Sequence, residues 1–315
     1  MSAVADSTIV PPSREAGIKA AEDAYRAEQS RARMRRRLLP AAGIAALIGV
    51  WAALVYLLKV PTFVAPSPQL VVITLAAKFN ILMANLLPTA IEAVSGFLLG
   101  NLTAIVIATA FVHKKSLEQA FFPVVVLINS IPVVAKAPIL VLLLGNGMEP
   151  KIAIAALVCF FPTLVNMVRG LESVNPQSLE LMKVLSASKT EIFFKLRLLN
   201  SVPYLFSALK IAASTAVIGA IVGEWIGSTT GIGALIIQST YNFDSAMLYA
   251  TVIVGSAFSV TFFLTITLIE RLVIERHEWL SADELARRPE RLADPEMPRL
   301  MRAAVAAVRG RDGHG

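Results

Sequence analysis

The sequence predicts an all-α, polytopic membrane protein. Its 315 residues are 56% hydrophobic and only 16% charged, whereas roughly a quarter of the residues of a soluble domain are charged. Apolar runs of about 20 residues recur, and a run of that length can cross the hydrocarbon core as an α-helix. Membrane-spanning strands would show a sustained alternation of apolar and polar residues, which we do not find. We therefore expect one membrane domain, residues 38–275, between a polar, basic tail, residues 1–37, and a charged tail, residues 276–315.

About six membrane spans are expected along the chain. Ser67 followed by Pro68 is a favourable N-cap and first-turn pair. An additional helix over residues 70–86 should therefore begin there and lie along the outer surface. The spans are expected at residues 38–58, 88–112, 117–144, 152–168, 204–226 and 246–269, and the third is interrupted by Pro123, Pro132 and Pro138.

The basic residues place both ends of the chain in the cytoplasm. An even number of spans leaves both ends on one side, and Lys and Arg collect in cytoplasmic loops. This distribution also accounts for the net charge of +7 without nucleic-acid binding. The basic groups on the cytoplasmic side are Arg31–Arg37, Lys114 and Lys115, Lys183–Arg197, and Arg271 and Arg276, whereas the opposite loops hold Lys59, Lys78 and Lys151.

A polar segment, residues 175–203, separates the fourth and fifth apolar runs. Asn175-Pro176 is typical of an N-cap followed by the first helical position. Ser188 and Glu191 have the spacing of a capping box. We therefore expect two short helices on the cytoplasmic side, separated by a turn at Ser186-Ala187-Ser188. Such a segment either only tethers two spans or docks on a cytoplasmic partner.

The polar segment resembles the cytoplasmic coupling loop of ABC transporter permeases of the binding-protein-dependent import class. The usual pattern of that loop is Glu-Ala-Ala, three residues, Gly, nine residues, Ile, one residue, Leu-Pro. Residues 186–225 also resemble the nitrate, sulfonate, taurine and pyrimidine-precursor permeases, and the resemblance covers about residues 40–275. In this sequence Glu180 matches the glutamate, Leu181 and Met182 replace the alanines, Ser186 stands for the glycine, Ala187-Ser188 fits the continuation, Leu198 matches the leucine, Leu199 replaces the proline, and Pro203 opens the fifth span.

This resemblance implies a fold like that of a type I ABC importer permease, working with other chains. Two permease subunits, expected to be a homodimer, would form the pore in the bacterial inner membrane. Each coupling loop would sit on an ATPase subunit, and a periplasmic binding protein would deliver a small polar or anionic solute. The sequence contains no Walker A pattern, G-x-x-x-x-G-K-[ST]. ATP hydrolysis is therefore expected on a separate chain.

Polar residues at membrane depth are candidates for the substrate path. A charge there is costly and usually faces protein or water, and irregular backbone is tolerated where it lines a cavity or is buried in protein. The candidates are Asn129, Ser130, Pro132, Lys136 and Glu224. Lys136 could attract an anionic solute, or it could pair with Glu92 or Glu224 and only hold helices together. For Glu92 and Glu224 a simple interfacial position is the alternative.

Glycines recur every four residues in the second and fifth spans. Small residues at this spacing let helix backbones approach closely. We expect them to pack helices within the subunit or at a dimer contact. They are Gly96 and Gly100, and Gly219, Gly223 and Gly227.

The sequence contains no catalytic constellation. No nucleophile lies beside a base, and no group of residues has the spacing of a metal site. We therefore expect a transport subunit with no metal and no cofactor. Two alternatives are a self-sufficient channel or ion-coupled carrier, which would move solute without ATP, and an integral membrane enzyme.

Overall fold

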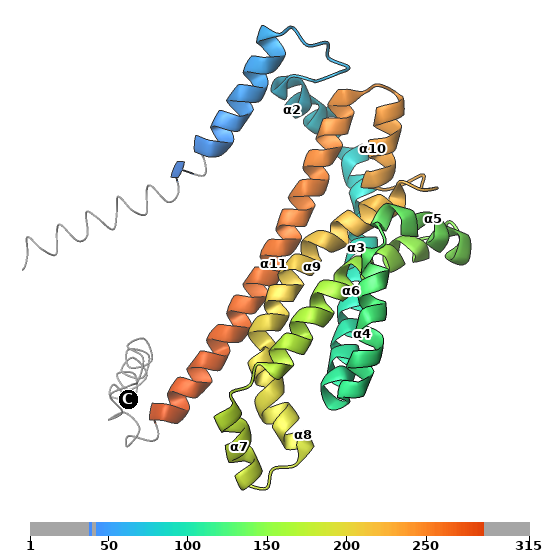
Figure 1. Ribbon diagram of the computed structural model, residues 1–315. Coiled ribbons are helices and arrows are strands. Elements are labelled where there is room, and N and C mark those ends of the chain that lie inside the picture. The colour runs from blue at the N-terminus through green and yellow to red at the C-terminus, as the bar shows by residue number, and fades with distance from the viewer. Residues whose placement is uncertain (1–37, 40–41, 287–315) are drawn as a thin grey trace, which may run out of the picture. The chain divides into compact units, whose positions relative to one another are not determined.

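The structure is a computed structural model that describes residues 38–39 and 42–286, with side chains as far as Val273. Every regular element in these residues is a helix, which confirms the predicted fold class (Figure 1). The predicted tail at residues 1–37 and the greater part of the tail predicted at residues 276–315 lie outside the described residues.

The chain divides into two compact units, residues 1–72 and 73–315. The described part of the first unit holds the apolar helix Ala42–Leu57, and α2, Pro68–Ala77, begins there. As predicted, α2 starts at the Ser67-Pro68 pair, where Ser67 Oγ accepts from Leu70 N at 3.3 Å. Tyr56 Oη lies 3.3 Å from Gln69 Oε1 across the turn between these helices.

The additional helix is shorter than predicted, because α2 ends at Ala77 and α3, Phe79–His113, begins after Lys78 alone. The predicted boundary before Pro88 is therefore wrong, since α3 runs through this proline. A spanning helix tolerates an internal proline when its neighbours hold both halves of the helix in place.

Of the three prolines predicted to interrupt the third span, Pro132 breaks it, whereas the predicted interruptions at Pro123 and Pro138 are wrong. The span consists of α4, Lys115–Ser130, and α5, Val133–Leu144, which meet at an angle of 99°. Ile131 has an extended backbone (φ −71°, ψ 127°), as expected for a residue that precedes proline. Pro123 and Pro138 lie inside the two helices.

Three long helices form the centre of the second unit. Both α3 and α9, Leu198–Glu224, pack against α6, Glu149–Glu172 (Figure 1). The shorter α10, Ile232–Tyr241, packs on α9 and α11, and α11, Ser245–Ala286, lies along α9. Since α11 continues to Ala286, the predicted start of the charged tail at residue 276 falls inside a helix.

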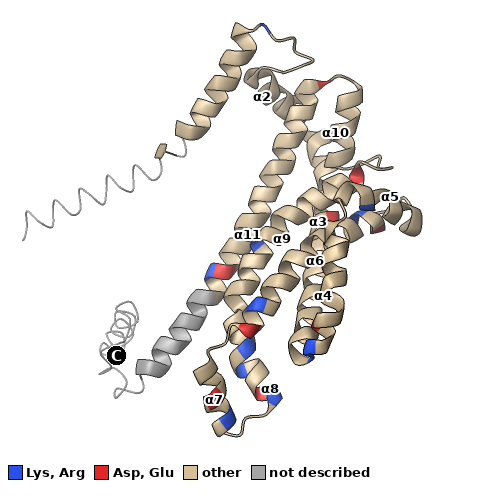
Figure 2. Ribbon diagram, in the orientation of Figure 1, with Lys and Arg blue, Asp and Glu red and all other residues tan. Residues whose placement is uncertain are grey.

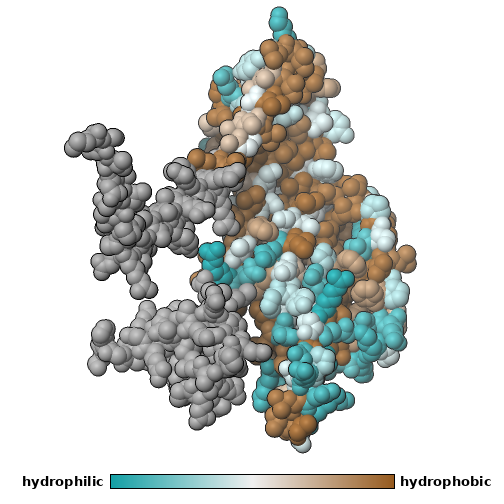
Figure 3. All heavy atoms as spheres, turned by 60° about the vertical axis from the view of Figure 1, so that its left-hand side comes forward, coloured by the Kyte–Doolittle hydropathy of each residue, from teal (hydrophilic) through white to brown (hydrophobic). Residues whose placement is uncertain are grey.

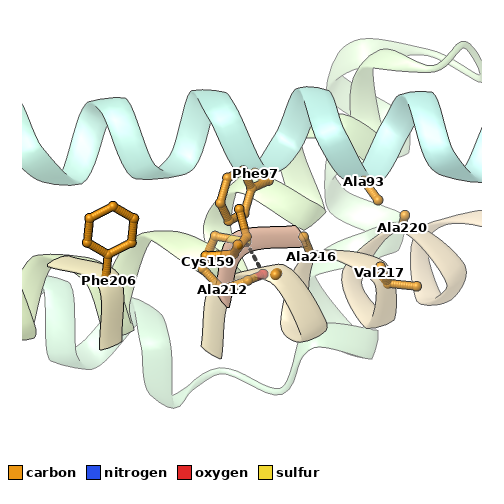
Figure 4. Packing of buried hydrophobic residues seen from close by; sticks show 10 residues of the cluster. Ala93, Phe97, Cys159, Phe206, Ala212, Ala216, Val217 and Ala220 are labelled. Atoms are coloured by element: carbon orange, nitrogen blue, oxygen red, sulfur yellow. Dashed lines mark hydrogen bonds between the residues drawn. The ribbon is translucent and has the colours of Figure 1, made fainter. Parts of the chain in front are cut away.

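Alanine lets α3 and α9 approach each other closely (Figure 4). Ala93 and Phe97 of α3 lie in one buried cluster with Ala212, Ala216 and Ala220 of α9. Cys159 of α6 joins this cluster and its thiol donates to the carbonyl of Ala212 at 3.2 Å. Small side chains of this kind are typical of helix contacts in membranes.

Fewer helices meet the length of a membrane span than the six predicted. Four helical stretches of the described chain are long and apolar enough, and the bent α4–α5 pair makes a fifth if it is one span. Helix Ala42–Leu57 has the expected apolar character but falls short of the about 20 residues that a span needs. The four stretches are Phe79–His113, Glu149–Glu172, Lys189–Glu224 and Ser245–Val273.

Candidate functional site

The polar segment, residues 175–203, begins with the predicted capped helix. This helix is α7, Pro176–Val184. The side chain of Asn175 accepts from Gln177 N at 2.9 Å, and Pro176 stands at the first helical position, where its missing N–H costs no hydrogen bond. The start of α7 is therefore determined by two adjacent residues.

The end of α7 is a Schellman turn at the predicted break. Ala187 N donates to Met182 O and Ser186 N to Lys183 O, both at 2.9 Å. The backbone of Ser186 has a φ of +54°, which lies in the left-handed region that favours glycine. This is the position at which the resembling loops usually carry glycine.

The predicted capping box then starts the next helix. Ser188 Oγ accepts from Glu191 N at 3.2 Å, and Glu191 Oε2 accepts from Ser188 N at 2.9 Å. Each side chain thereby satisfies a backbone donor that has no partner within the helix. The helix that begins here is α8, Lys189–Ile192.

The second helix of the polar segment is not a separate one, which corrects the prediction. After α8 the chain forms one π-helical turn, η1, Phe193–Arg197, and continues directly as α9. In this turn Leu198 N donates to Phe193 O, five residues earlier. Pro203 lies inside α9 and does not open it. Residues 189–203 of the polar segment are thus the first part of a continuous helix, Lys189–Glu224.

The π-helical turn is anchored to the ends of α3 and α6. Phe193 is buried in a cluster with side chains of both helices, and its ring lies 5.0 Å from that of His113. Arg197 Nη1 donates to Leu171 O at 3.2 Å. Asn200 Nδ2 donates to Ser173 O at 3.0 Å. A displacement of the π-helical turn would therefore act directly on α3 and α6.

An ion pair links the same end of α6 to the broken span. Lys115 Nζ, at the start of α4, lies 2.7 Å from Glu172 Oε1, at the end of α6. It also lies 2.8 Å from Glu118 Oε2 on its own helix. Figure 2 shows charged residues gathered at this end of the second unit, around α7, α8 and the start of α4.

The outward face of α7 exposes large apolar side chains. Leu181 is 60% exposed, Val184 80% and Leu185 67%. Figure 3 shows a hydrophobic patch bordered by hydrophilic residues at the tip of the unit where α7 and α8 lie in Figure 1. An exposed apolar patch rimmed by polar residues is typical of a protein interaction site.

Four of the predicted path residues lie at the break between α4 and α5. Asn129 and Ser130 end α4, and Pro132 caps α5. Lys136, in the first turn of α5, is half-buried and forms no ion pair with any described residue. The Oγ of Ser130 donates to its own helix, to Val126 O at 2.9 Å.

Glu224, the fifth predicted path residue, belongs to a buried polar cluster at the end of α9. Three side chains there accept from the first amides of α10, which have no partner within that helix. These contacts are Gly231 N to Asn85 Oδ1 at 2.9 Å, Ile232 N to Thr89 Oγ1 at 2.8 Å, and Gly233 N to Glu224 Oε2 at 2.5 Å. Thr89 Oγ1 in turn donates to Glu224 Oε1 at 2.5 Å.

Two further charged residues complete this cluster and were not predicted to meet. Glu92, expected near an interface, is only 2% exposed, and Lys151, expected in a loop, is only 6% exposed. Lys151 Nζ lies 3.7 Å from Glu92 Oε1 and donates to Ser228 Oγ at 3.0 Å. Lys151, and not Lys136, is therefore the cation beside Glu92. One feature of the sequence could have indicated this cluster: charged residues are rare within apolar helices, so those that occur there tend to lie against one another.

The repeated glycines lie around α6. A Cβ on Gly96 or Gly100 of α3 would meet the α6 backbone, and one on Gly219 of α9 would lie 2.8 Å from the Cα of Ala155. Gly223 similarly faces Lys151. The packing is thus within the subunit at these four positions, whereas Gly227 forms a turn with φ +72°.

Residues 96–277, more than half of the chain, match the family described as binding-protein-dependent transport system inner membrane component. The chain therefore belongs to this family, as the resemblance of its polar segment predicts. Its several apolar helices agree with a multi-pass inner-membrane permease.

Individual relatives agree with this assignment. A probable ABC transporter permease protein of Haemophilus influenzae is 32% identical over 74% of this chain and 96% of its own length. The formylaminopyrimidine transport permease protein ThiX of Halalkalibacterium halodurans is 32% identical over 67% of this chain and 85% of its own length. The riboflavin transport system permease protein RibX of Chloroflexus aurantiacus is 31% identical, with coverages of 72% and 86%. The chain is thus a transport permease subunit and not an enzyme.

Proposed function

We propose that two copies of this chain form the solute pore of an ATP-driven importer in the bacterial inner membrane. A periplasmic binding protein delivers the solute to the outer face, and the polar segment docks on a separate ATPase subunit at the cytoplasmic face. Membership of the binding-protein-dependent family supports these partners. The observation that carries the docking role is the exposed apolar face of α7.

The local structure of the polar segment suits it to docking. The capped start of α7, its Schellman turn and the capping box fix the segment through contacts within itself. A preformed surface loses little conformational entropy on binding. Because Phe193 and Arg197 connect its far end to α3 and α6, movement of the bound partner would reach the spanning helices.

The solute is proposed to be a small polar heteroaromatic molecule or an organic anion. Two of the relatives are named for the transport of formylaminopyrimidine and riboflavin, both nitrogen heterocycles. Lys136 at the broken span supports this class, because a half-buried lysine without an ion-pair partner among the described residues can attract a negative or electron-rich group.

The docking role is tested with Val184→Glu, which places a charge on the most exposed apolar position of α7. We expect the ATPase subunit to bind at least about thirty-fold more weakly, as for a hot-spot residue, and ATP-dependent uptake to fall with it. Lys183→Gln is the matched control, because it changes the net charge by the same amount on the opposite side of α7. Wild-type ATPase binding and uptake by Val184→Glu would show that this face does not dock.

The dependence on ATP separates the proposal from a self-sufficient channel or carrier. The chain alone and the assembled complex are reconstituted in liposomes, and uptake of riboflavin and of a formylaminopyrimidine is measured with and without ATP. We expect uptake only by the complex with ATP and loaded binding protein. Uptake by the chain alone would support the channel or carrier instead.

A further inference from the structure

A buried carboxyl pair lies where α3, α6 and α9 meet the start of α10. Glu92 and Glu224 are 2% and 1% exposed, and Thr89, which lies one helical turn before Glu92 on α3, donates to Glu224 Oε1 at 2.5 Å. Lys151 Nζ lies 3.7 Å from Glu92 Oε1, and Lys151 packs against Gly223, the residue before Glu224. In Figure 2 a small group of acidic and basic positions is visible beside the labels of α3 and α5, within otherwise uncharged helices. In the described part of the chain, two buried acidic groups thus lie beside one buried basic group.

The hydrogen bonds of this pair are incomplete without an additional hydrogen. Both oxygens of Glu224 already accept, one from Thr89 and one from Gly233 N. The Oε2 atom of Glu92 is buried, and no donor among the described residues reaches it. A carboxylate only accepts hydrogen bonds, whereas a protonated carboxyl also has one O–H donor. A proton on Glu92 Oε2 would turn this unpartnered acceptor into a donor, and the carboxylate of Glu224 in the same buried cluster is an acceptor for it.

We propose that Glu92 and Glu224 form a buried binding site for a single proton. Two carboxylates this close together and away from water do not both stay ionised, because their repulsion is hardly screened. With one proton bound, a single negative charge remains opposite the ammonium of Lys151. The proton belongs to the pair, with Glu92 as the hydrogen-bond donor and Glu224 as the acceptor.

The proton site controls the start of α10. Gly233 N, in the first turn of α10, donates to Glu224. This hydrogen bond forms only while the side chain of Glu224 keeps its position. One negative side chain at a helix N-terminus is stabilising, but a second charge beside it repels the first. Loss of the proton would therefore push the two carboxylates apart and loosen α10 from α3 and α9. The site is a proton-dependent latch, and this role does not depend on the proposed transport function.

The charges around the pair set the sign of its pH dependence. Lys151, on α6, forms an ion pair with Glu92, whereas among the described residues Glu149 on α6, Lys136 on α5 and Asp244 before α11 form no ion pair with either carboxyl group. Residues 225–240, which include most of α10, contain no titratable side chain. The latched state binds one proton more than a state with separated, ionised carboxyl groups. It therefore loses stability as the pH rises.

Infrared spectroscopy of the full chain in lipid nanodiscs tests the bound proton directly. A protonated carboxyl group has a C=O stretching band that a carboxylate lacks. We expect such a band in the wild type at neutral pH and its loss in Glu92→Gln. Glu270→Gln is the matched control, because Glu270 is half-buried and paired with Lys210 at 2.8 Å, so the band should persist. A spectrum in which Glu92→Gln removes no carboxylic-acid band would overturn the proposal.

The latch, in which a proton on the carboxyl pair holds the start of α10, is tested by melting temperatures. They are measured across roughly pH 6 to pH 9, where buried carboxyl groups can titrate. The amide of Glu92→Gln keeps a permanent donor toward Glu224 and an acceptor toward Lys151. We expect the wild type to lose stability relative to this variant as the pH rises. Glu224→Gln should instead lower the melting temperature at every pH and speed hydrogen exchange at Gly233, because both oxygens of Glu224 accept.

Two results would contradict the latch. In the first, the difference in melting temperature between the wild type and Glu92→Gln does not change with pH. In the second, added Na⁺ or Ca²⁺ raises the melting temperature of the wild type but not of Glu92→Gln, which would show that a metal cation occupies the site. Both measurements read the folded state and need no transport activity.

Discussion

Replacing Ser186 by glycine is expected to stabilise the Schellman turn that ends α7. Ser186 has a φ of +54°, and the left-handed conformation costs a residue with a Cβ about 1–2 kcal/mol. Glycine avoids this cost but loses more backbone freedom on folding, by about 0.5–1 kcal/mol. The net gain is about 0.5–1 kcal/mol. With the described residues the Ser186 side chain makes no hydrogen bond that the substitution would remove, and its backbone N–H donates to Lys183 O.

The gain should appear as a smaller population of the locally open turn and not as a large rise in overall melting temperature. A gain of about 0.5–1 kcal/mol corresponds to an approximately two- to five-fold lower population of the open form. Hydrogen exchange at Ala187, whose amide donates to Met182 O, would measure it. Ser186→Ala is the control, because alanine keeps the Cβ and should bring no gain. Equal exchange rates in Ser186→Gly and the wild type would refute the assignment of strain to this residue.

Two further substitutions test the helix packing through melting temperature in detergent. Gly100→Ala should destabilise the chain by about 1–3 kcal/mol, because its Cβ would overlap the α6 backbone, whereas Gly43→Ala meets nothing within 4 Å and should be neutral or stabilising. Thr163→Val should cost about 1–3 kcal/mol, because it leaves the buried Oδ1 of Asn101 without its donor at 2.6 Å. Thr103→Val, at an exposed hydroxyl bonded to its own helix, should change stability by less than about 0.5 kcal/mol. Comparable losses in a variant and its control would contradict the packing argument.

The features that the sequence predicted well depend on contacts between near neighbours. The caps at Asn175-Pro176 and Ser188–Glu191 join residues two or three positions apart, so the residue types alone specify them. The break at Pro132 has the same local cause, because proline restricts its own backbone and that of the residue before it.

The features that the sequence missed depend on distant packing. Nothing near Pro88 or Pro203 indicates that each lies inside a helix, because neighbouring helices decide whether the helix continues. The hydrogen bond between Thr89 and Glu224 joins residues 135 positions apart. The pairing of Lys151 with Glu92 similarly requires α3 and α6 to lie side by side.

One continuous helix connects the two sites of this protein. It begins at Lys189 beside the capping box and ends at Glu224 in the buried proton site, a length of about 54 Å at 1.5 Å per residue. Its irregular features, the π-helical turn and Pro203, both lie in the first part. From Tyr204 onward the helix is regular and is held against α6 by Gly219 and Gly223. We therefore expect a displacement that passes the π-helical turn to reach Glu224, and bending at that turn to absorb it. A mechanical link between the proposed docking segment and the proposed proton site would thus depend on the packing of Phe193 against α3 and α6.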